Sequence, residues 1–346
     1  MNKTFYKLSQ KIKLLPYNSL LKISGQKIIL PFYHCVSNDN PVHIRNLYNI
    51  RTTEDFEKDL DFFLKYYEAI DFTQLKSLIN KDKIKKKCFL LSFDDGLREF
   101  HDIIAPILMR KGIPAVCFLN TDFIDNKKMF YRFKAGILIE TLKSNSSSPA
   151  EKTKIDQWFE DNFPENGDIY SSLLSINYNN SHLLDELASI TGTDFNDYLK
   201  AEKPYLTTEQ INDLIKKGFH FGAHSLDHPQ YSEISESEKI VQTKNSIENV
   251  IKSFDLNYRL FSFPFSDINV PKDFFEIIFN PENPIADLTF GTAGLKKDEV
   301  KNNLQRIPME VDNFAAEDIL YGEYMYYILK SFFNKNVIRR EMRNEE

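Results

Sequence analysis

The 346-residue sequence predicts an α/β protein whose parallel strands form an incomplete (β/α)7 barrel, interrupted by a mostly helical insertion. Three observations support this fold class: seven short apolar runs rich in β-forming residues, helical patterns between most of them, and no G-x-G-x-x-G turn after an early strand. The missing turn argues against a doubly wound sheet. The expected strands are residues 27–36, 88–94, 115–120, 219–225, 260–266, 288–291 and 305–311.

Amphipathic helices are predicted between these strands because apolar residues recur at intervals of three and four. Thr207 and Gln210 form a capping box at the start of one helix, and Gly218 is placed to end it. A barrel of this kind has its active site at the C-terminal ends of the strands. The clearest stripes are Phe56, Leu60, Phe63, Leu64 and Tyr67, and then Ile240, Ile247, Ile251 and Phe254.

The barrel is expected to span residues 28–312. Residues 126–204 interrupt it as a polar, mostly helical insertion that contains the only tryptophan, Trp158. Residues 313–346 are expected to form a C-terminal helical tail. Residues 1–27 precede the barrel as a basic amphipathic segment.

The N-terminal segment, residues 1–27, has two interpretations. Its apolar side chains recur at helical spacing with lysines between them, as in a helix that lies on an anionic membrane. The same pattern fits a helix that closes one end of the fold, and we favour this interpretation because one apolar stripe seldom discriminates. The stripe consists of Phe5, Leu8, Ile12 and Leu15.

Composition and charge exclude several classes of protein. With 42% hydrophobic residues the chain is too apolar to be disordered. The net charge is -6, and 44 basic and 50 acidic residues are mixed along the chain, so no nucleic-acid partner is expected. Lysines interrupt every candidate signal peptide, and Cys35, Cys88 and Cys117 form no C-x-x-C pair. We therefore expect a cytoplasmic protein, membrane-peripheral if residues 1–27 lie on a membrane.

Two adjacent carboxylates, Asp94 and Asp95, stand at the end of the expected strand 88–94. Adjacent carboxylates repel each other unless a positive charge lies nearby, and a divalent cation bound by one of them leaves the other ionised as a base. A solvated Asp-Asp-Gly turn is the alternative. His224 and His228 end another expected strand, and two imidazoles four residues apart can converge on one ion.

Together these motifs resemble those of polysaccharide deacetylases, carbohydrate esterase family four. Ser-Phe-Asp-Asp-Gly at 92–96, His-Ser-x-x-His at 224–228 and Phe-Pro-Phe at 263–265 follow in the family's order. The resemblance extends from about residue 28 to residue 311, apart from the insertion, and includes a Tyr-His element on the first strand. It implies the barrel of this family and a carbohydrate substrate.

The resemblance also implies a role for each matching residue. Asp95, His224 and His228 are expected to bind a divalent metal, most readily zinc. Asp94 is expected to be the general base that activates water. The backbone N–H of Phe265 is expected to stabilise the tetrahedral oxyanion, and Pro264 is expected to lie beside the substrate.

Two features of the family are missing. The family commonly has an arginine two residues before Pro264, and this chain has Ser262 there. The family also commonly has a catalytic histidine in a Leu-x-His motif near the last strand. This chain has Leu-Gln-Arg there, ending in Arg306. Arg306 is a candidate for part of the missing arginine's role beside the substrate. We expect His34 to be the general acid, because it ends the first strand at the same barrel mouth.

The sequence thus predicts a hydrolase that removes an N-acetyl group from an amino sugar in a polysaccharide, oligosaccharide or lipid-linked precursor. Aromatic residues of the insertion are expected to line the sugar site. Two alternatives remain open: a catalytically inactive carbohydrate-binding homologue, suggested by the two missing residues, and an amidohydrolase on a small non-sugar amide. Asp94 favours an enzyme, because proton abstraction needs it and metal binding does not.

Overall fold

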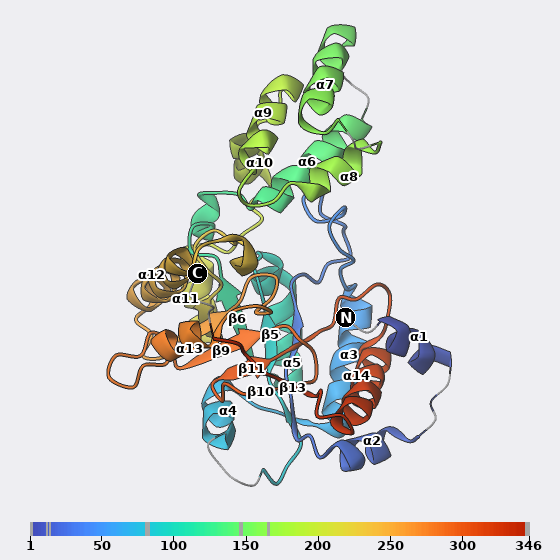
Figure 1. The fold of residues 1–346 in the computed structure, drawn as a ribbon, viewed down its shortest axis with the longest axis vertical. Coiled ribbons are helices and arrows are strands. Elements are labelled where there is room, and N and C mark those ends of the chain that lie inside the picture. The colour runs from blue at the N-terminus through green and yellow to red at the C-terminus, as the bar shows by residue number, and fades with distance from the viewer. Residues whose placement is uncertain are drawn as a thin grey trace.

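The structure is a computed structural model that describes residues 3–11, 13, 15–79, 84–144, 148–164 and 167–342. Figure 1 shows a barrel-like body surrounded by helices, with helices α6 to α10 forming a lobe at one end. Ile12, which belongs to the predicted N-terminal stripe, lies outside the described residues.

Eight short parallel strands form the barrel, in the order β11-β9-β8-β7-β6-β5-β2-β12. The strands at the two ends of this order, β11 and β12, are separated in the chain by Arg306 alone, so one segment pairs with both β9 and β2. The sheet therefore nearly closes, with β11 and β12 sharing the seventh position, and the predicted incomplete barrel is confirmed. The strands are β2 (Pro31–Tyr33), β5 (Leu91–Phe93), β6 (Ala115–Leu119), β7 (His220–Ala223), β8 (Leu260–Ser262), β9 (Leu288–Gly291), β11 (Asn303–Gln305) and β12 (Ile307–Pro308).

Helices cover the outside of the barrel, which buries the strands on both faces and explains their continuous apolar runs. The capping box of Thr207 and Gln210 is present, and it starts the helix before β7. A small second sheet of β1 (Ile28–Ile29), β4 (Cys88–Phe89) and β3 (Glu68–Ala69) extends the barrel strands at one end. The covering helices are α3 (Thr53–Tyr66), α4 (Phe72–Ile79), α5 (Ala105–Lys111), α11 (Thr208–Lys216), α12 (Glu236–Phe254) and α13 (Lys272–Ile278).

The lobe between residues 127 and 204 contains helices and no strand among its described residues. Its helices pack around their own apolar cluster, which includes Trp158 and also receives Ile44 from the loop after β2. The lobe is therefore joined to the barrel through apolar packing as well as through the chain. Its helices are α6 (Tyr131–Lys143), α7 (Pro149–Asn162), α8 (Ile169–Ser175), α9 (His182–Thr191) and α10 (Phe195–Glu202).

The N-terminal helices α1 (Lys3–Lys11) and α2 (Tyr17–Ser24) pack against α14 (Ala316–Ser331). The side chain of Tyr6 is fully buried there, and its hydroxyl donates a hydrogen bond to Glu323 at 2.5 Å. This packing agrees with a helix that closes one end of the fold. Among the described residues, no helix has both the length and the apolar character that crossing a membrane requires.

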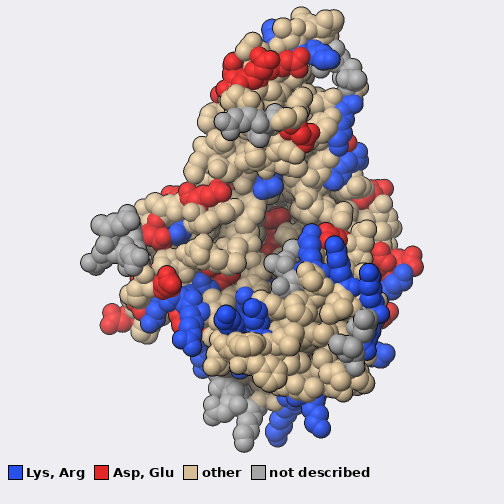
Figure 2. Space-filling view, turned by 45° about the vertical axis from the view of Figure 1, so that its right-hand side comes forward, with Lys and Arg blue, Asp and Glu red and all other residues tan. Residues whose placement is uncertain are grey.

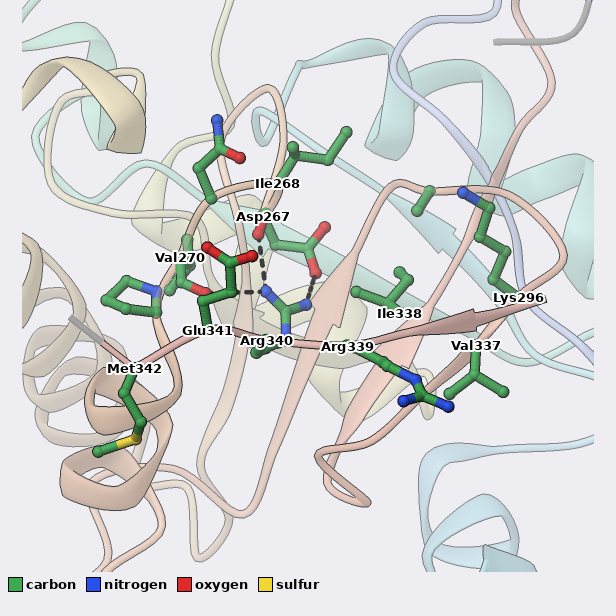
Figure 3. A pocket seen from close by; sticks show the side chains of 13 residues that line it. Asp267, Ile268, Val270, Lys296, Val337, Ile338, Arg339, Arg340, Glu341 and Met342 are labelled. Atoms are coloured by element: carbon green, nitrogen blue, oxygen red, sulfur yellow. Dashed lines mark hydrogen bonds and ion pairs between the residues drawn. The ribbon is translucent and has the colours of Figure 1, made fainter. Parts of the chain in front are cut away.

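The C-terminal tail was predicted to be helical, but its described part contains, after α14, a short strand, β13 (Val337–Ile338), which pairs with β10 (Lys297–Asp298). The guanidinium of Arg340 is buried here, where it donates to the backbone oxygen of Asp267 at 2.8 Å and to the carboxylate of Asp298 at 2.6 Å. Arg340 and Asp267 line a cavity of about 680 Å³, and Figure 3 shows both residues in its wall. The tail is therefore held to the barrel by a buried charge cluster.

Candidate active site

The predicted site residues all stand where a barrel strand ends. His34 follows β2, Asp94 and Asp95 follow β5, His224 follows β7, and Phe265 lies a few residues after β8. The C-terminal ends of parallel barrel strands share one rim, so these side chains meet although they are far apart in sequence. Figure 2 shows a hollow on this face, between the lobe and the barrel, with acidic side chains inside it.

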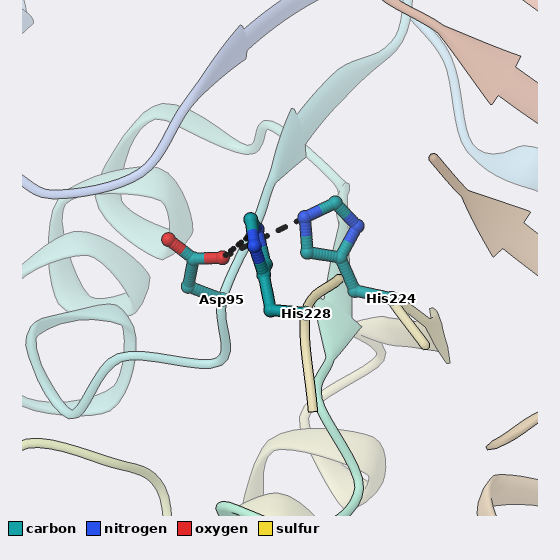
Figure 4. Close-up of side chains that lie close together, drawn as sticks. All are labelled: Asp95, His224 and His228. Carbon is teal, nitrogen blue, oxygen red and sulfur yellow. Dashed lines mark ion pairs between the residues drawn. The ribbon is translucent and has the colours of Figure 1, made fainter. Parts of the chain in front are cut away.

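Asp95, His224 and His228 form a buried cluster of three potential metal ligands (Figure 4). The Oδ1 atom of Asp95 lies 3.6 Å from Nε2 of His224 and 3.3 Å from Nε2 of His228. These contacts are longer than ordinary hydrogen bonds, and no described residue donates a hydrogen bond to the buried Oδ1 of Asp95. A tetrahedral ion with bonds of about 2.0–2.1 Å separates its ligands by roughly 3.4 Å, so the three atoms have the spacing that such an ion needs.

The imidazole of His224 is held in the form that binds metals. Its Nδ1 lies 2.8 Å from the backbone oxygen of Ser262, to which it donates, so Nε2 keeps its lone pair for the cluster. Burial lowers the pKa of His224 to about 4, which keeps the ring neutral. Burial by itself would raise the pKa of Asp95, but the neighbouring His228 lowers it, so this carboxylate is ionised. One anionic oxygen and neutral imidazole nitrogen are the donors that zinc prefers.

Backbone strain is concentrated in the turns that present these groups. Asp95, Ser225, His228 and Phe265 have φ angles of 70°, 70°, 66° and 55°, in the left-handed region that residues with a side chain seldom adopt. Each such residue costs of order 1–3 kcal/mol, so the surrounding contacts must fix the conformation. The hydroxyl of Ser225 does so for one turn by accepting the backbone N–H of His228 at 2.9 Å. The turns are therefore rigid supports for the ligands.

Asp94 does not take part in the three-ligand cluster, because Arg306 binds its carboxylate. The guanidinium donates to both oxygens of Asp94 at 2.7 Å and also to the hydroxyl of Ser262 at 2.6 Å. Arg306 is fully buried, and its guanidinium lies 4.2 Å from the ring centre of Phe32. Burial alone would raise the pKa of Asp94, but Arg306 lowers it, so Asp94 is an oriented, ionised base.

Arg306 thus occupies the place of the arginine that is missing at Ser262. It reaches Asp94 from the interruption between β11 and β12, two strand positions from Ser262 on β8, whose hydroxyl it also binds. Arg306 does not belong to the residues that line the pocket, and neither does Pro264, which was expected beside the substrate.

His34 forms a pair with Glu310, which the sequence gave no direct reason to select. Nδ1 of His34 lies 2.6 Å from Oε2 of Glu310, and the same carboxylate accepts the backbone N–H groups of His34 and Cys35 at 2.8 and 2.9 Å. Burial by itself would lower the pKa of His34, but Glu310 raises it to about 9. Glu310 could have been noticed because it lies in the last expected strand, 305–311, which ends at the same rim.

The site opens into a pocket of about 370 Å³. Phe130 and Arg132 line its wall from the start of the insertion, and Tyr48 lines it from the loop after β2. The sequence did not single out these three residues, because their contact with the site depends on how the lobe packs on the barrel. The other lining residues include His34, Asp94, Asp95, His224, His228, Phe265, Thr292 and Glu310.

A buried Asp-His-His cluster beside an ionised, arginine-held carboxylate at a barrel mouth defines the class of hydrolytic enzymes that cleave acyl groups with a metal and a base. The family model described as polysaccharide deacetylase matches residues 81–273, more than half of the sequence. The chain belongs to this family and is a deacetylase hydrolase that acts on a glycan. Enzymes of this family generally depend on a divalent metal, for which the Asp-His-His cluster is the candidate site.

Solved structures share this fold. The Streptococcus pyogenes deacetylase PplD in complex with acetate has 16% identity and a TM-score of 0.54, over 86% of this chain and 98% of that one. IcaB from Ammonifex degensii has 13% identity and a TM-score of 0.52, with 86% and 98% covered. BC0361, a polysaccharide deacetylase from Bacillus cereus, has 12% identity and a TM-score of 0.51, with 86% and 69% covered. No curated protein sequence matches the chain.

Proposed function

We propose that this protein removes the acetyl group from an N-acetylated amino sugar in a glycan, with a divalent ion, preferably zinc, held by Asp95, His224 and His228. The observation that carries the proposal is the position of Asp94, an ionised carboxylate that Arg306 holds beside this cluster and that is not one of its three ligands. When bound, such an ion polarises the acetyl carbonyl and makes water more acidic. The remaining chemistry belongs to side chains and backbone groups of this chain.

Asp94 accepts the proton of the attacking water. Arg306 uses one N–H for each oxygen of Asp94, and a carboxylate has about four lone-pair sites, so acceptor capacity remains on the side that faces the pocket. The bidentate contact also prevents rotation of the carboxylate. Asp94 is therefore both charged and correctly oriented before the substrate arrives.

The backbone N–H of Phe265 is available for the oxyanion of the tetrahedral intermediate. No acceptor for this N–H is found among the described residues, and Phe265 lines the pocket. Thr292 donates its hydroxyl to the carbonyl oxygen of Phe265 at 2.9 Å, and the ring of Phe265 lies 4.7 Å from that of His228. These contacts hold the strained residue, so its N–H is fixed before the reaction.

His34 supplies the proton that the leaving amine needs. With a pKa of about 9 its imidazole is protonated at neutral pH, and Glu310 occupies Nδ1, so Nε2 remains to donate. The pair of His34 and Glu310 supports an enzyme over a silent binding protein, because mere binding of a glycan has no use for a charged acid next to a general base.

Acetate release from a panel of N-acetylated oligosaccharides, lipid-linked sugars and small non-sugar amides tests the proposal. We expect release from the sugars, loss of activity with a chelator, and recovery when zinc is restored. Asp94→Asn should lower the rate by about 10²-fold or more while metal content is unchanged. Release that persists after chelation, or an Asp94→Asn variant with the parental rate, would refute the proposed chemistry. Release from the non-sugar amides alone would refute the substrate class.

A further inference from the structure

Arg132 places a positive charge in the wall of the active-site pocket. It is the second residue of α6, at the start of the insertion, and its side chain is half-buried. The guanidinium lies 5.8 Å from the ring centre of Phe265, whose ring in turn lies 4.7 Å from that of His228. The ring of Phe265 therefore lies between Arg132 and the metal cluster. A ligand of one or two sugar units can reach from the cluster to Arg132.

The other charged groups around this pocket already have partners of opposite sign. Asp94 is bound by Arg306 and Glu310 by His34, while Asp95 belongs to the proposed metal cluster. Arg132 differs, because none of the described carboxylates lies within ion-pair distance of its guanidinium.

Two nearby cations do bind carboxylates of the lobe. Arg45 binds Glu140 at 2.9 Å, and Lys134, only two residues after Arg132, binds Asp185 at 2.7 Å. Arg132 is also the only lysine or arginine among the described residues that line the pocket. Among the described residues, Arg132 thus hydrogen-bonds to the neighbouring Tyr131 but has no carboxylate partner, and it lines the same pocket as the catalytic groups.

The surroundings of Arg132 favour an oxyanion as its partner. Phe130 and Phe265 line the pocket wall beside it, and such apolar surroundings strengthen a charge–charge contact. A planar guanidinium with several N–H groups matches the oxygens of a phosphate or carboxylate. Helix α6 also begins here without a side-chain cap, so its first turn adds positive potential on the same side.

We infer that Arg132 binds an anionic group, a phosphate or a carboxylate, on the glycan that is deacetylated. The substrate class is then an acidic glycan, whose charged group lies on the N-acetylated sugar or on its direct neighbour. This inference rests on the proposed function of the Asp-His-His site, because it assumes that the sugar occupies the pocket of about 370 Å³.

The test compares kcat/KM for acetate release from matched N-acetylated disaccharides that are neutral, phosphorylated or contain a uronic acid. The parent should prefer one of the anionic forms by about 10- to 100-fold, as expected for a charged hydrogen-bonded contact. Arg132→Gln should lose this preference, Arg132→Lys should retain part of it, and high salt should weaken it in the parent. Arg110→Gln, which removes an exposed charge on the far side of α5, is the matched control and should keep the preference.

An Arg132→Gln variant with the parental ratio of anionic to neutral kcat/KM would overturn the inference. The relative kcat/KM values for the phosphorylated and the uronic-acid disaccharides identify which anion Arg132 binds. If the parent releases no acetate from any sugar, the proposed function fails, and calorimetric titration with the phosphorylated disaccharide still tests Arg132. Binding that is weakened about tenfold or more in Arg132→Gln, and not in Arg110→Gln, supports the inference, and equal binding refutes it.

Discussion

Replacing Glu310 by glutamine should make the activity depend strongly on pH. Glutamine keeps the shape and an oxygen for the backbone N–H groups of His34 and Cys35, but it removes the charge that raises the pKa of His34 to about 9. Asp94 and Asp95 also raise the pKa of His34, more weakly than Glu310 does, and the variant keeps both. Because burial opposes them, we expect the pKa of His34 to fall to about its ordinary value of 6.5.

The size of the effect follows from the fraction of protonated imidazole. A general acid is protonated and active below its pKa, and its protonated fraction falls as the pH rises through that value. At pH 8 a group with a pKa of about 9 is roughly 90% protonated, whereas one with a pKa of about 6.5 is roughly 3% protonated. The variant should therefore lose about 30-fold in kcat/KM at pH 8 but less than about twofold at pH 6.

The assay is kcat/KM for acetate release between pH 5.5 and 9.5, with metal content measured in parallel. Glu276→Gln, which removes an exposed carboxylate of α13, is the control and should keep the parental profile. A Glu310→Gln profile that runs parallel to the parental one would show that Glu310 does not set the proton affinity of the acid. Loss of metal from the variant would show that Glu310 acts on the ligands instead.

The other predictions concern two of the buried arginines, Arg306 and Arg340. Arg306→Met leaves the carboxylate of Asp94 buried without a partner, so it should lower the free energy of unfolding by about 3–5 kcal/mol in urea denaturation at pH 7. Adding Asp94→Asn should restore much of the lost stability. An Arg306→Met variant as stable as the parent would contradict the account. Arg340→Met should cost a similar amount because it leaves two buried carboxylates side by side, whereas Arg339→Met, at its exposed neighbour, should change stability by less than about 0.5 kcal/mol. Equal effects of the two tail variants would refute a structural role of the cluster.

The barrel could be predicted from the sequence because its strands are buried on both faces and give continuous apolar runs. The pattern also placed Asp94, Asp95, His224 and His228 at one rim, since each follows the end of a strand. The split of the last strand at Arg306 could not be foreseen. It arises because this one segment pairs with both edges of the sheet, which is visible only when the barrel closes.

Partners that are distant in sequence account for most of what was missed. The contacts between Arg306 and Asp94 and between His34 and Glu310 join residues 212 and 276 positions apart, and no local pattern encodes them. The short strand Val337–Ile338 lacks a periodic signal, and the charge cluster around Arg340 holds it in place. Arg132 was not noticed because only the packing of the lobe turns it into the pocket.

The most direct test of the account is a crystal structure of the protein with zinc, with diffraction data collected on both sides of the zinc absorption edge. The account predicts one anomalous peak within about 2.0–2.2 Å of a carboxylate oxygen of Asp95 and of Nε2 of both His224 and His228, with Asp94 still bound to Arg306. A zinc ion that binds elsewhere, or one that recruits Asp94 as a ligand and releases Arg306, would contradict it.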